Sequence, residues 1–514
     1  RPWSQALSDE SEATSLPHSV AYVSLSTDSH NYTMQEFALR YFRKPQKLDH
    51  KGGGAKGKSM ASLVQYTKAP IRESLICLSD EDMNRQAVGS FRALMQFMGD
   101  QSKPQGKDEI DLLYMLLKLC REEEKLRDEI YCQAIKQVTG HPRPELCARG
   151  WTFLSLLTGS FLPSTTLMPY VTKFLQDSGP SQELAQRSQE HLQCTVKYGG
   201  RQRLPSPGEM QALLKGKPVH LLQIHMPGGV DYKTNIRTFT VAAEVLEELC
   251  RHMGIMDPQE VQEFALFLIK REGGLVRPLW PQEYLNSVLD EDVSLHSRRL
   301  GWETQLHFDD PTYISTHYGQ VLRDYLQGKL VVSALEEAHL ARLAALQHLS
   351  KAQEGPPSEQ DLLAYLPKSL PWQVNLATIK SLTGQELRQL QGHSSKEAQI
   401  SFIETISQLP LFGYTVYVVL RVSELALPGP GLLGLNRQQL VIMDPSSQKP
   451  CCSITLRDVQ RLHLLSPLES QGPPGLELNY GSVENPQTIW FELPQAQELK
   501  HTIAFLLDGS PAST

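Results

Sequence analysis

Two short segments of the chain carry residue types that nucleotide chemistry uses. The first is GGGAKGKS, from Gly52 to Ser59, which matches the phosphate-loop pattern G-x-x-x-x-G-K-[ST]. In such a loop several backbone N–H groups converge on a phosphate, and the lysine, here Lys58, neutralises it. The second is LVIMD, from Leu440 to Asp444, an apolar run that ends in an acid suited to holding magnesium. Together the two segments raise the hypothesis of a nucleotide hydrolase.

The surroundings of both segments argue against that hypothesis. A phosphate loop needs a buried strand before it and a helix after it, because the turn between them creates the anion site. The sequence before Gly52 is polar, basic and broken by Pro45, and the sequence after Ser59 stops at Pro70. Asp444 precedes a Pro-Ser-Ser turn sequence, so we expect LVIMD to be one strand of an antiparallel meander. We therefore interpret the glycine-rich segment as a solvated flexible loop, and we predict no enzymatic activity and no cofactor.

Length and composition predict several domains. The chain has 514 residues, of which 40% are hydrophobic, which is enough for three or four ordinary cores. The net charge of −7 gives no general case for nucleic acid, and the longest apolar run, LLYMLL, is too short to cross a bilayer. The eight cysteines include no C-x-x-C pair and the 16 histidines show no ligand spacing, so we predict buried, reduced thiols and no metal. A start at Arg1 without a signal sequence is expected of a cytosolic piece of a longer protein.

Helical periodicity dominates residues 32–203, which we predict to form one all-α domain after an N-terminal extension at 1–31. Thr33 and Glu36 have the spacing of a capping box, in which each side chain satisfies a free backbone N–H at the helix start. Acids before an apolar stripe, and Gly99 after it, mark a second helix. A further apolar stripe recurs every fourth residue, at Leu126, Ile130, Ala134 and Val138.

Two segments of this region carry a family resemblance. LRDEIYCQAIKQVTGHP, from Leu126 to Pro142, and GWTFLSLLTGSFLPS, from Gly150 to Ser164, are similar to the signature of the myosin-tail homology 4 domain. The matching residues of the first segment are Arg127, Asp128, Glu129, Tyr131, Gln133, Lys136 and Gln137. His141 stands where that family usually has asparagine, and we expect no consequence from the difference. The resemblance implies a bundle of helices.

The rest of the chain divides into a linker and three lobes. After a linker at 204–216, strand–turn–strand–helix–strand signals over 217–308 predict a ubiquitin-like roll, with VHLLQIHM and IRTFTV as its first two strands. Residues 309–412 have the pattern of four or five amphipathic helices. Residues 413–509 carry seven short strands and a last helix, typical of a pleckstrin-homology-like barrel, before a tail at 510–514. The predicted fold is multidomain α+β: an all-α helical bundle followed by three lobes.

The three lobes resemble a FERM module, on phrases such as VRPLWPQEYLNSVL and LPLFGYTVY. A myosin-tail homology 4 domain followed by FERM is typical of unconventional myosin tails, and the sequence is most similar to the second such tandem of the myosin XV class, then to the myosin VII class. The resemblance implies a non-catalytic, cytoplasmic cargo-binding tail, with actin contact and ATPase activity in a motor domain elsewhere in the parent protein. It implies scaffold partners, such as a whirlin-like PDZ scaffold, in actin-rich protrusions such as stereocilia. A FERM-type linker between membrane and cytoskeleton stays open as the alternative.

We predict a peptide groove between the fifth strand of the last lobe, DVQRLHLLS, and the terminal helix. An exposed strand edge can pair with the backbone of a partner peptide, while alternate side chains select its sequence. The candidate residues are Val459, Arg461, His463 and Leu465 on one face of the strand and Leu499 and Ile503 on the helix. In a second interpretation the apolar members of this set seal the barrel, which leaves Arg461 and His463 as the peptide contacts.

Two other surfaces are candidates for partner binding. Between Tyr32 and Pro70 there are eight basic and two acidic residues, and the candidate basic patch consists of Arg40, Arg43, Lys44 and Lys47. Such a patch would attract acidic partners, such as microtubule tails or phosphoinositides, although a solvated helix end and loop explains it equally well. The family resemblance also implies docking at the junction between the helical domain and the ubiquitin-like lobe, where the sequence singles out no residues.

Overall fold

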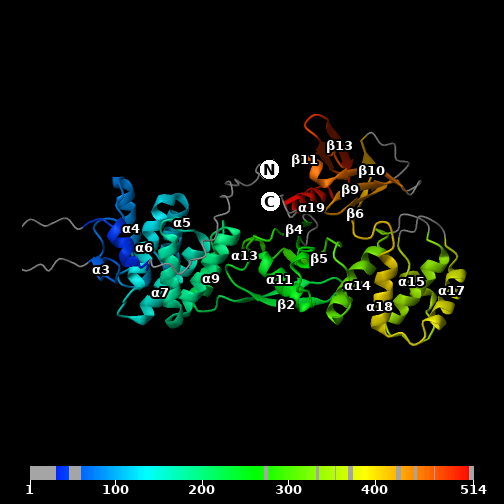
Figure 1. The fold of residues 1–514 in the computed structure, drawn as a ribbon, viewed down its shortest axis with the longest axis horizontal. Coiled ribbons are helices and arrows are strands. Elements are labelled where there is room, and N and C mark those ends of the chain that lie inside the picture. Colours follow the sequence, from blue (N-terminus) through cyan, green and yellow to red (C-terminus); the bar gives the residue numbers. More distant parts are fainter. Residues whose placement is uncertain are drawn as a thin grey trace, which may run out of the picture.

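The computed structural model of this chain describes residues 31–44, 60–270, 276–330, 335–353, 355–368, 374–423, 430–444, 449–467 and 469–508. Lys47 and the glycine-rich segment from Gly52 to Ser59, which includes Lys58, lie outside the described residues. Figure 1 shows an elongated molecule, with the helical domain at one end, a lobe containing a sheet in the middle and a second helical lobe at the other end. The last lobe, a barrel of strands, lies above the middle lobe in this view. The predicted multidomain α+β fold is confirmed.

The helical domain is a bundle around one hydrophobic core. Its elements are α2 (Met34–Tyr41), α3 (Met60–Leu63), α4 (Glu81–Met98), α5 (Glu109–Glu122), the short 3-10 helix η1 (Glu124–Leu126), α6 (Arg127–Val138), α7 (Pro144–Ser160), α8 (Met168–Ser178), η2 (Gly179–Ser181) and α9 (Glu183–Tyr198). The stripe predicted from Leu126 to Val138 is buried in this core. α4 begins after its N-cap Asp80 and ends at Gly99, whose φ of 95° favours glycine, as predicted. No described helix is long and apolar enough to span a bilayer.

The segment that joins the bundle to the lobes is itself a helix. α10 (Pro207–Leu214) begins at a capping box between Ser206 and Glu209. Its Met210 is fully buried in the core of the bundle. The hydroxyl of Tyr114, on α5, donates a hydrogen bond to the carbonyl of Pro205 (2.6 Å). The joint is therefore packed against the bundle along its length.

The middle lobe is a five-stranded sheet with a helix on one face. It contains β1 (His220–His225), β2 (Asp231–Ile236), α11 (Ala242–His252), α12 (Pro258–Val261), β3 (Phe264–Lys270), β4 (Val276–Pro278), α13 (Leu285–Val288) and β5 (Val293–Arg299). The strand order is β2-β1-β5-β3-β4, and β1 pairs in parallel with β5. Leu222 and Ile224 of β1 face the same core as Val245 of α11, so the apolar face of the sheet is covered by this helix.

The prediction of the second strand of this lobe, IRTFTV, is wrong by five residues. β2 ends at Ile236, where that segment begins. Arg237 and Thr240 form a turn instead: the N–H of Thr240 donates to the carbonyl of Arg237 (3.2 Å), and the Thr240 hydroxyl accepts from the N–H of Arg237 (2.8 Å). This turn directs Phe239 into the core of the helical bundle. The β-branched pattern is typical of a strand, but packing against another domain decides the conformation.

The last two lobes are a bundle of short helices and a barrel. The helices are α14 (Pro311–Leu326), α15 (Glu337–Ser350), α16 (Glu359–Ala364), α17 (Leu376–Gln389) and α18 (Ser395–Ile406). The barrel contains β6 (Thr415–Val419), β7 (Arg421–Val422), β8 (Gly431–Leu435), β9 (Gln439–Met443), β10 (Pro450–Thr455), η3 (Leu456–Asp458), β11 (Val459–Leu465), β12 (Gly475–Gly481), β13 (Pro486–Glu492) and the closing helix α19 (Ala496–Asp508). Its sheets have the orders β10-β9-β8-β6 and β11-β12-β13-β7, and the buried face of α19 packs into their common core.

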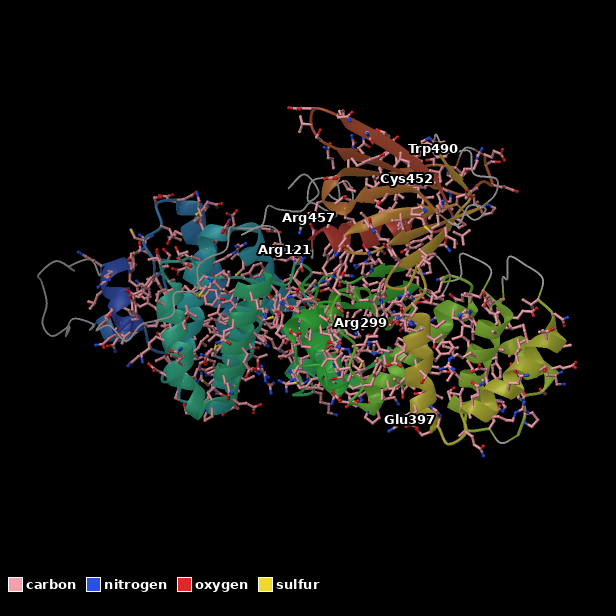
Figure 2. The ribbon with its side chains drawn as sticks, turned by 45° about the vertical axis from the view of Figure 1, so that its right-hand side comes forward. Arg121, Arg299, Glu397, Cys452, Arg457 and Trp490 are labelled. Atoms are coloured by element: carbon pink, nitrogen blue, oxygen red, sulfur yellow. The ribbon has the colours of Figure 1, made fainter. Side chains whose placement is uncertain are left out.

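The three lobes are held together by buried contacts. Arg299, at the end of β5, is 1% exposed and lies near the middle of the molecule in Figure 2. Its guanidinium pairs with Glu263 and donates to the hydroxyl of Tyr313 on α14 (3.0 Å). The outer face of the sheet contributes Phe267 to the core of the barrel. The middle lobe is therefore the centre against which the other two are packed.

Candidate partner-binding surfaces

The signature residues of the helical domain lie on α6, where they hold the backbone of their own domain. α6 is buried along nearly its whole length, although it carries charged and amide side chains. The ammonium of Lys136 donates to the carbonyls of Ser62 and Gln65 (3.3 and 2.5 Å). The side-chain oxygen of Gln137 accepts from the N–H of Thr67 (3.1 Å). These side chains fix the irregular segment that precedes α4.

Glu129 is a completely buried carboxylate in the same helix. Its oxygens accept the backbone N–H groups of Leu75 and Ile76 (2.8 Å each) and the amide of Gln133 (2.9 Å). Burial raises the pKa of Glu129, and the two backbone N–H groups act in the opposite direction. The side chain thus clamps a segment with little secondary structure against α6.

The other signature residues fix the segment after α7. The hydroxyl of Tyr131 donates to the carbonyl of Phe161 (2.6 Å). The carboxylate of Asp128 accepts from the N–H and the hydroxyl of Ser164 (2.7 and 2.5 Å). The guanidinium of Arg127 lies over the ring of Phe161, 5.1 Å from its centroid. The signature residues therefore maintain the fold of the bundle.

His141 has a similar role, and the expectation that histidine in place of asparagine has no consequence stays a prediction. Its side chain is fully buried, and its Nε2 lies 2.9 Å from the carboxylate of Asp100. Because Nδ1 accepts from the N–H of Arg143 (3.0 Å), Nε2 is the nitrogen that donates to Asp100. The ring also packs on Tyr66, with centroids 4.3 Å apart. In a single sequence, only the departure from the usual asparagine pointed to this position.

The junction between the bundle and the middle lobe is a shared hydrophobic core. Phe239, from the turn after β2, is 5% exposed and packs against His191 of α9, with ring centroids 4.7 Å apart. It fills the space beside Gly159 of α7, where a Cβ would lie 2.6 Å from the phenyl ring. The hydroxyl of Tyr284 donates to the carbonyl of Gly199 (2.6 Å). The two domains are thus locked together by both packing and hydrogen bonds.

Arg201 joins three segments at this junction and is 2% exposed. Its guanidinium donates to both oxygens of Glu209 (2.7 and 2.9 Å), to the carbonyl of Thr238 (3.0 Å) and to the hydroxyl of Ser287 (2.9 Å). Burial alone would raise the pKa of Glu209, but hydrogen bonds from Arg201 and from the N–H of Ser206 outweigh it and hold this pKa below its ordinary value. The sequence did not indicate Arg201, because a lone arginine after two glycines has no distinctive spacing.

β11 forms an open edge of the barrel. It pairs with β12 on one side, and among the described strands none pairs with its other side. α19 packs next to β11 and β12. Arg461 and His463 are exposed on this strand. An edge strand keeps backbone N–H and C=O groups that a further strand can use, so β11 is suited to accept an extended peptide.

Val459 does not share a face with Arg461, contrary to the prediction. The pairing of β11 with β12 shifts its register between these two residues, because Gln460 forms a β-bulge. As a result Val459 and Leu462 both point into the barrel core, with 3% and 5% of their surface exposed. Leu465 is half-buried, on the same face as Arg461.

The candidate residues of α19 are part of the barrel. Leu499 and Ile503 are fully buried in its core. They seal the barrel, as in the second of the two interpretations, and they offer no surface to a peptide. The exposed side chains of the candidate set are therefore Arg461 and His463.

The outer face beside β11 is polar, with one aromatic residue. His463 lies opposite Glu477 of β12, which lies opposite Trp490 of β13. Trp490 is half-buried and lies on the barrel in Figure 2. Arg461 lies opposite the neutral Asn479, and the acid Glu477 is its diagonal neighbour on β12, so no acidic residue stands directly opposite the Arg461 charge. An acidic side chain of an added peptide strand would supply that missing partner.

The candidate basic patch is only partly available to a partner. The guanidinium of Arg43 donates to the hydroxyl of Ser74 (3.1 Å) and to a nearby backbone carbonyl, which ties the end of α2 to the bundle. Arg40 and Lys44 are exposed. The fourth member lies outside the described residues. Arg43 is therefore a structural residue, which the charge pattern alone did not reveal.

The acid of the second nucleotide-like segment directly follows an antiparallel strand, as predicted. β9 pairs antiparallel with both β8 and β10. The N–H of Asp444, which follows β9, donates to the carbonyl of Lys449 across the hairpin (3.2 Å). A magnesium-holding acid of a nucleotide hydrolase follows a strand of a parallel sheet instead. This segment therefore belongs to the barrel meander.

Two family models match the chain. The MyTH4 domain, which is the myosin-tail homology 4 domain, matches residues 113–212. The FERM central domain matches residues 303–417. The first range covers α6 and α7 and ends within the joint helix α10, and the second covers the helical lobe and the start of the barrel.

Curated relatives and a solved structure extend the match to nearly the whole chain. Human unconventional myosin-XVB is 74% identical over 515 residues, which cover 100% of this chain and 16% of that protein. Human unconventional myosin-XV is 33% identical over 498 residues, which cover 92% of this chain and 14% of that protein. The C-terminal MyTH4-FERM domain of human myosin 7b, solved in complex with the harmonin-a PDZ3 domain, has a TM-score of 0.63 at 20% identity and covers 96% of this chain and 100% of that one. The chain thus spans a small part of the length of the two curated relatives.

Proposed function

This chain is a MyTH4–FERM tandem of the kind found in unconventional myosin tails, and from that premise we propose that it is the cargo-binding part of an actin-based motor. The two domains are non-catalytic. In this proposal the tail links the motor to scaffold proteins at the tips of actin-filled protrusions such as stereocilia. The support comes from the similarity to myosin-XV and from an open binding edge on the barrel.

The open edge of β11 is the observation that carries the proposal. Its backbone can extend the sheet by one strand, and Arg461 projects from it with no acidic residue directly opposite. A peptide strand that pairs with β11 would place one acidic residue opposite Arg461. Backbone hydrogen bonds would supply general affinity, and this charge pair would supply selectivity.

A display library of peptides from disordered protein regions tests this edge. The purified full chain is the bait, and peptides with an acidic residue within an extended segment are the expected outcome. Arg461→Glu should weaken the enriched peptides by about tenfold, since it replaces attraction by repulsion at one position. The matched control is Arg388→Glu, a charge reversal at an exposed position on α17. Equal affinity of the enriched peptides for both variants would exclude β11 as the site.

We propose PDZ-containing scaffolds as the partner class, whirlin-like scaffolds among them. The support is that the myosin 7b homologue was solved with a harmonin-a PDZ domain. Calorimetric titration of the full chain with such a PDZ domain should give saturable binding, on the order of micromolar or tighter. No heat of binding at about a hundred times that concentration would remove this partner class from the proposal.

We do not extend the proposal to acidic lipids or microtubules. Arg43, one member of the candidate basic patch, already donates hydrogen bonds to groups of the bundle. Among the members of the patch that the structure describes, Arg40 and Lys44 are exposed, and their attraction in water is modest because salt screens exposed charges. Flotation with phosphoinositide vesicles at physiological salt is the direct check, and we expect the chain to stay with the unbound fraction.

A further inference from the structure

The joint between the bundle and the lobes carries an exposed serine in a sequence that suits a protein kinase. Residues Arg203 to Pro207 are RLPSP, so Ser206 has a proline after it and an arginine three residues before it. Kinases recognise such local proline and charge patterns in their substrates. Ser206 is also the N-cap of α10, Pro207 is the first residue of that helix, and Arg203 Nη1 donates to the carbonyl of Ser287 (3.5 Å), so the role proposed below adds to a structural one.

The structure presents Ser206 to solvent in an accessible form. Ser206 and Pro207 are both exposed, and Ser206 has extended backbone angles (φ −65°, ψ 161°) before the first turn of α10. Its hydroxyl oxygen accepts the N–H of Glu209 (3.3 Å), which uses a lone pair and leaves the O–H itself for reaction. The hydroxyl of Ser206 is therefore accessible at the surface, although Pro205 before it is buried.

We propose that Ser206 is phosphorylated by a proline-directed protein kinase, and that the phosphate loosens the joint between the helical bundle and the middle lobe. In this step Ser206 Oγ forms a bond to the γ-phosphorus of ATP held by the kinase. The bond between that phosphorus and the β–γ bridging oxygen breaks, ADP leaves, and the hydroxyl proton passes to the catalytic base of the kinase. The product carries close to two negative charges at neutral pH.

The new charge arrives next to the ion pair that holds the joint. Glu209 connects Ser206 to Arg201, because its Oε2 accepts both the Ser206 N–H (2.7 Å) and the Arg201 Nη2 (2.9 Å). A phosphate on Ser206 repels this carboxylate and competes with it for the guanidinium. Arg201 also holds Thr238 and Ser287 of the middle lobe, so its displacement removes contacts across the junction.

The helix that carries the serine is expected to remain. Negative charge is favourable at a helix N-terminus, and Met210 keeps α10 anchored in the bundle. The effect of the phosphate is therefore on the contact between α10 and the middle lobe. This makes the joint a point at which modification can change the coupling of the two domains, independently of peptide capture by β11.

Phosphorylation of the full chain in vitro tests the site. The chain is incubated with a proline-directed cyclin-dependent kinase and magnesium ATP, and the phosphate is mapped by mass spectrometry. We expect Ser206 to be the first residue labelled. Ser466 serves as the internal comparison, because it is also exposed and is followed by Pro467 but has a histidine three residues before it in place of the arginine. Arg203→Ala should slow labelling of Ser206 severalfold and leave Ser466 unchanged. Labelling of Ser466 without Ser206 would overturn the proposed site.

Hydrogen exchange tests the loosening of the joint. The phosphorylated chain is compared with the same sample after phosphatase treatment, so that no substitution at the helix cap is needed. We expect amides of residues 237–241 and 284–288 to exchange several times faster in the phosphorylated chain, while α4 and α17 keep their rates. Unchanged exchange at the junction would overturn the regulatory half of the proposal, and would leave the labelling result to decide the site.

Discussion

Several charged and amide residues of the helical bundle serve its own backbone. The carboxylate of Glu129 and the ammonium of Lys136 are buried, and both hold segments that have little secondary structure. The helical periodicity and the family resemblance placed both residues on α6, but neither could show their partners. Those partners lie more than 50 residues away in the chain, at Leu75 and Gln65.

Removal of the Glu129 carboxylate should destabilise the bundle strongly. Glu129→Ala leaves the N–H of the buried Leu75 and the N–H of the half-buried Ile76 without their acceptor, and a buried group left so costs about 1–3 kcal/mol. We therefore expect the free energy of unfolding, measured with urea at pH 7, to fall by about 3 kcal/mol. Glu122→Ala, at an exposed position on α5, is the control and should change it little. A loss below about 0.5 kcal/mol for Glu129→Ala would contradict the clamp.

His317 should make the stability of the chain fall in mild acid. Its Nδ1 donates to the carbonyl of Tyr313 (2.7 Å), and its Nε2 accepts from Arg299 (2.9 Å), so the folded chain holds it neutral. Burial, together with Arg299, lowers the pKa of His317 to about 3. Between about pH 6.5 and pH 3 this histidine binds a proton in the unfolded chain but stays neutral in the folded chain. The free energy of unfolding therefore falls as the pH falls from about 6.5 towards 3.

The expected loss from this histidine between pH 7 and pH 5 is about 2 kcal/mol. His317→Gln removes the titrating group. Between pH 7 and pH 5 the free energy of unfolding of this variant should therefore fall by about 2 kcal/mol less than that of the unchanged chain. Urea unfolding of both proteins at the two pH values provides the comparison. Parallel pH profiles of the two proteins would show that His317 does not titrate in this way.

Close approach between elements depends on a few glycines. Gly319 of α14 lies against Gly228 in the turn after β1, and a Cβ on Gly319 would lie 2.6 Å from the Gly228 backbone. This contact brings the helical lobe against the middle lobe. Sequence periodicity indicated the helix, but a glycine within it gives no sign of which element it faces.

Two glycine-to-alanine substitutions should have opposite effects. The methyl group of Gly319→Ala would push α14 away from the turn at Gly228. We expect the free energy of unfolding to fall by about 1–3 kcal/mol. Gly89 of α4 is exposed, and a Cβ added there would have nothing within 4 Å, so Gly89→Ala should stabilise the protein by about 0.5–1 kcal/mol. Urea unfolding at pH 7 measures both. If both variants are stabilised, the close approach of the two lobes is not as described.

Local irregularities set the limit of element prediction in this chain. The alternation over DVQRLHLLS predicted a strand, and β11 is that strand. It did not predict the bulge at Gln460, which turns Val459 into the core and leaves Arg461 outside. Bulges depend on pairing with a neighbouring strand, and this information is absent from the pattern of one segment.

At the scale of the whole molecule, the bundle and the middle lobe share one core. Phe239 comes from the middle lobe and is buried among residues of the bundle. The order and fold of the domains could be predicted from the sequence, since each has its own periodicity. The junction could not, because Arg201, Phe239 and Gly159 have no pattern in common and meet only in the folded chain.

Phe239→Ala should uncouple the bundle from the middle lobe. The substitution leaves a cavity where the buried phenyl ring was. Such a change usually lowers the free energy of unfolding by about 3–5 kcal/mol. In scanning calorimetry we expect one cooperative transition for the unchanged chain and two separate transitions for the variant. Leu363→Ala, at a 60% exposed position of the helical lobe, should keep a single transition. A single transition in the Phe239 variant would show that other contacts suffice to couple the domains.

Amide exchange of β11 tests most directly whether this tandem is a platform that captures extended protein segments. The full chain is measured alone and with a saturating amount of a peptide enriched by display. We predict that the amides of Val459–Leu465 exchange at least several times more slowly in the complex, because a new strand occupies the open edge. Saturating binding with unchanged exchange in β11 would contradict this role of the edge.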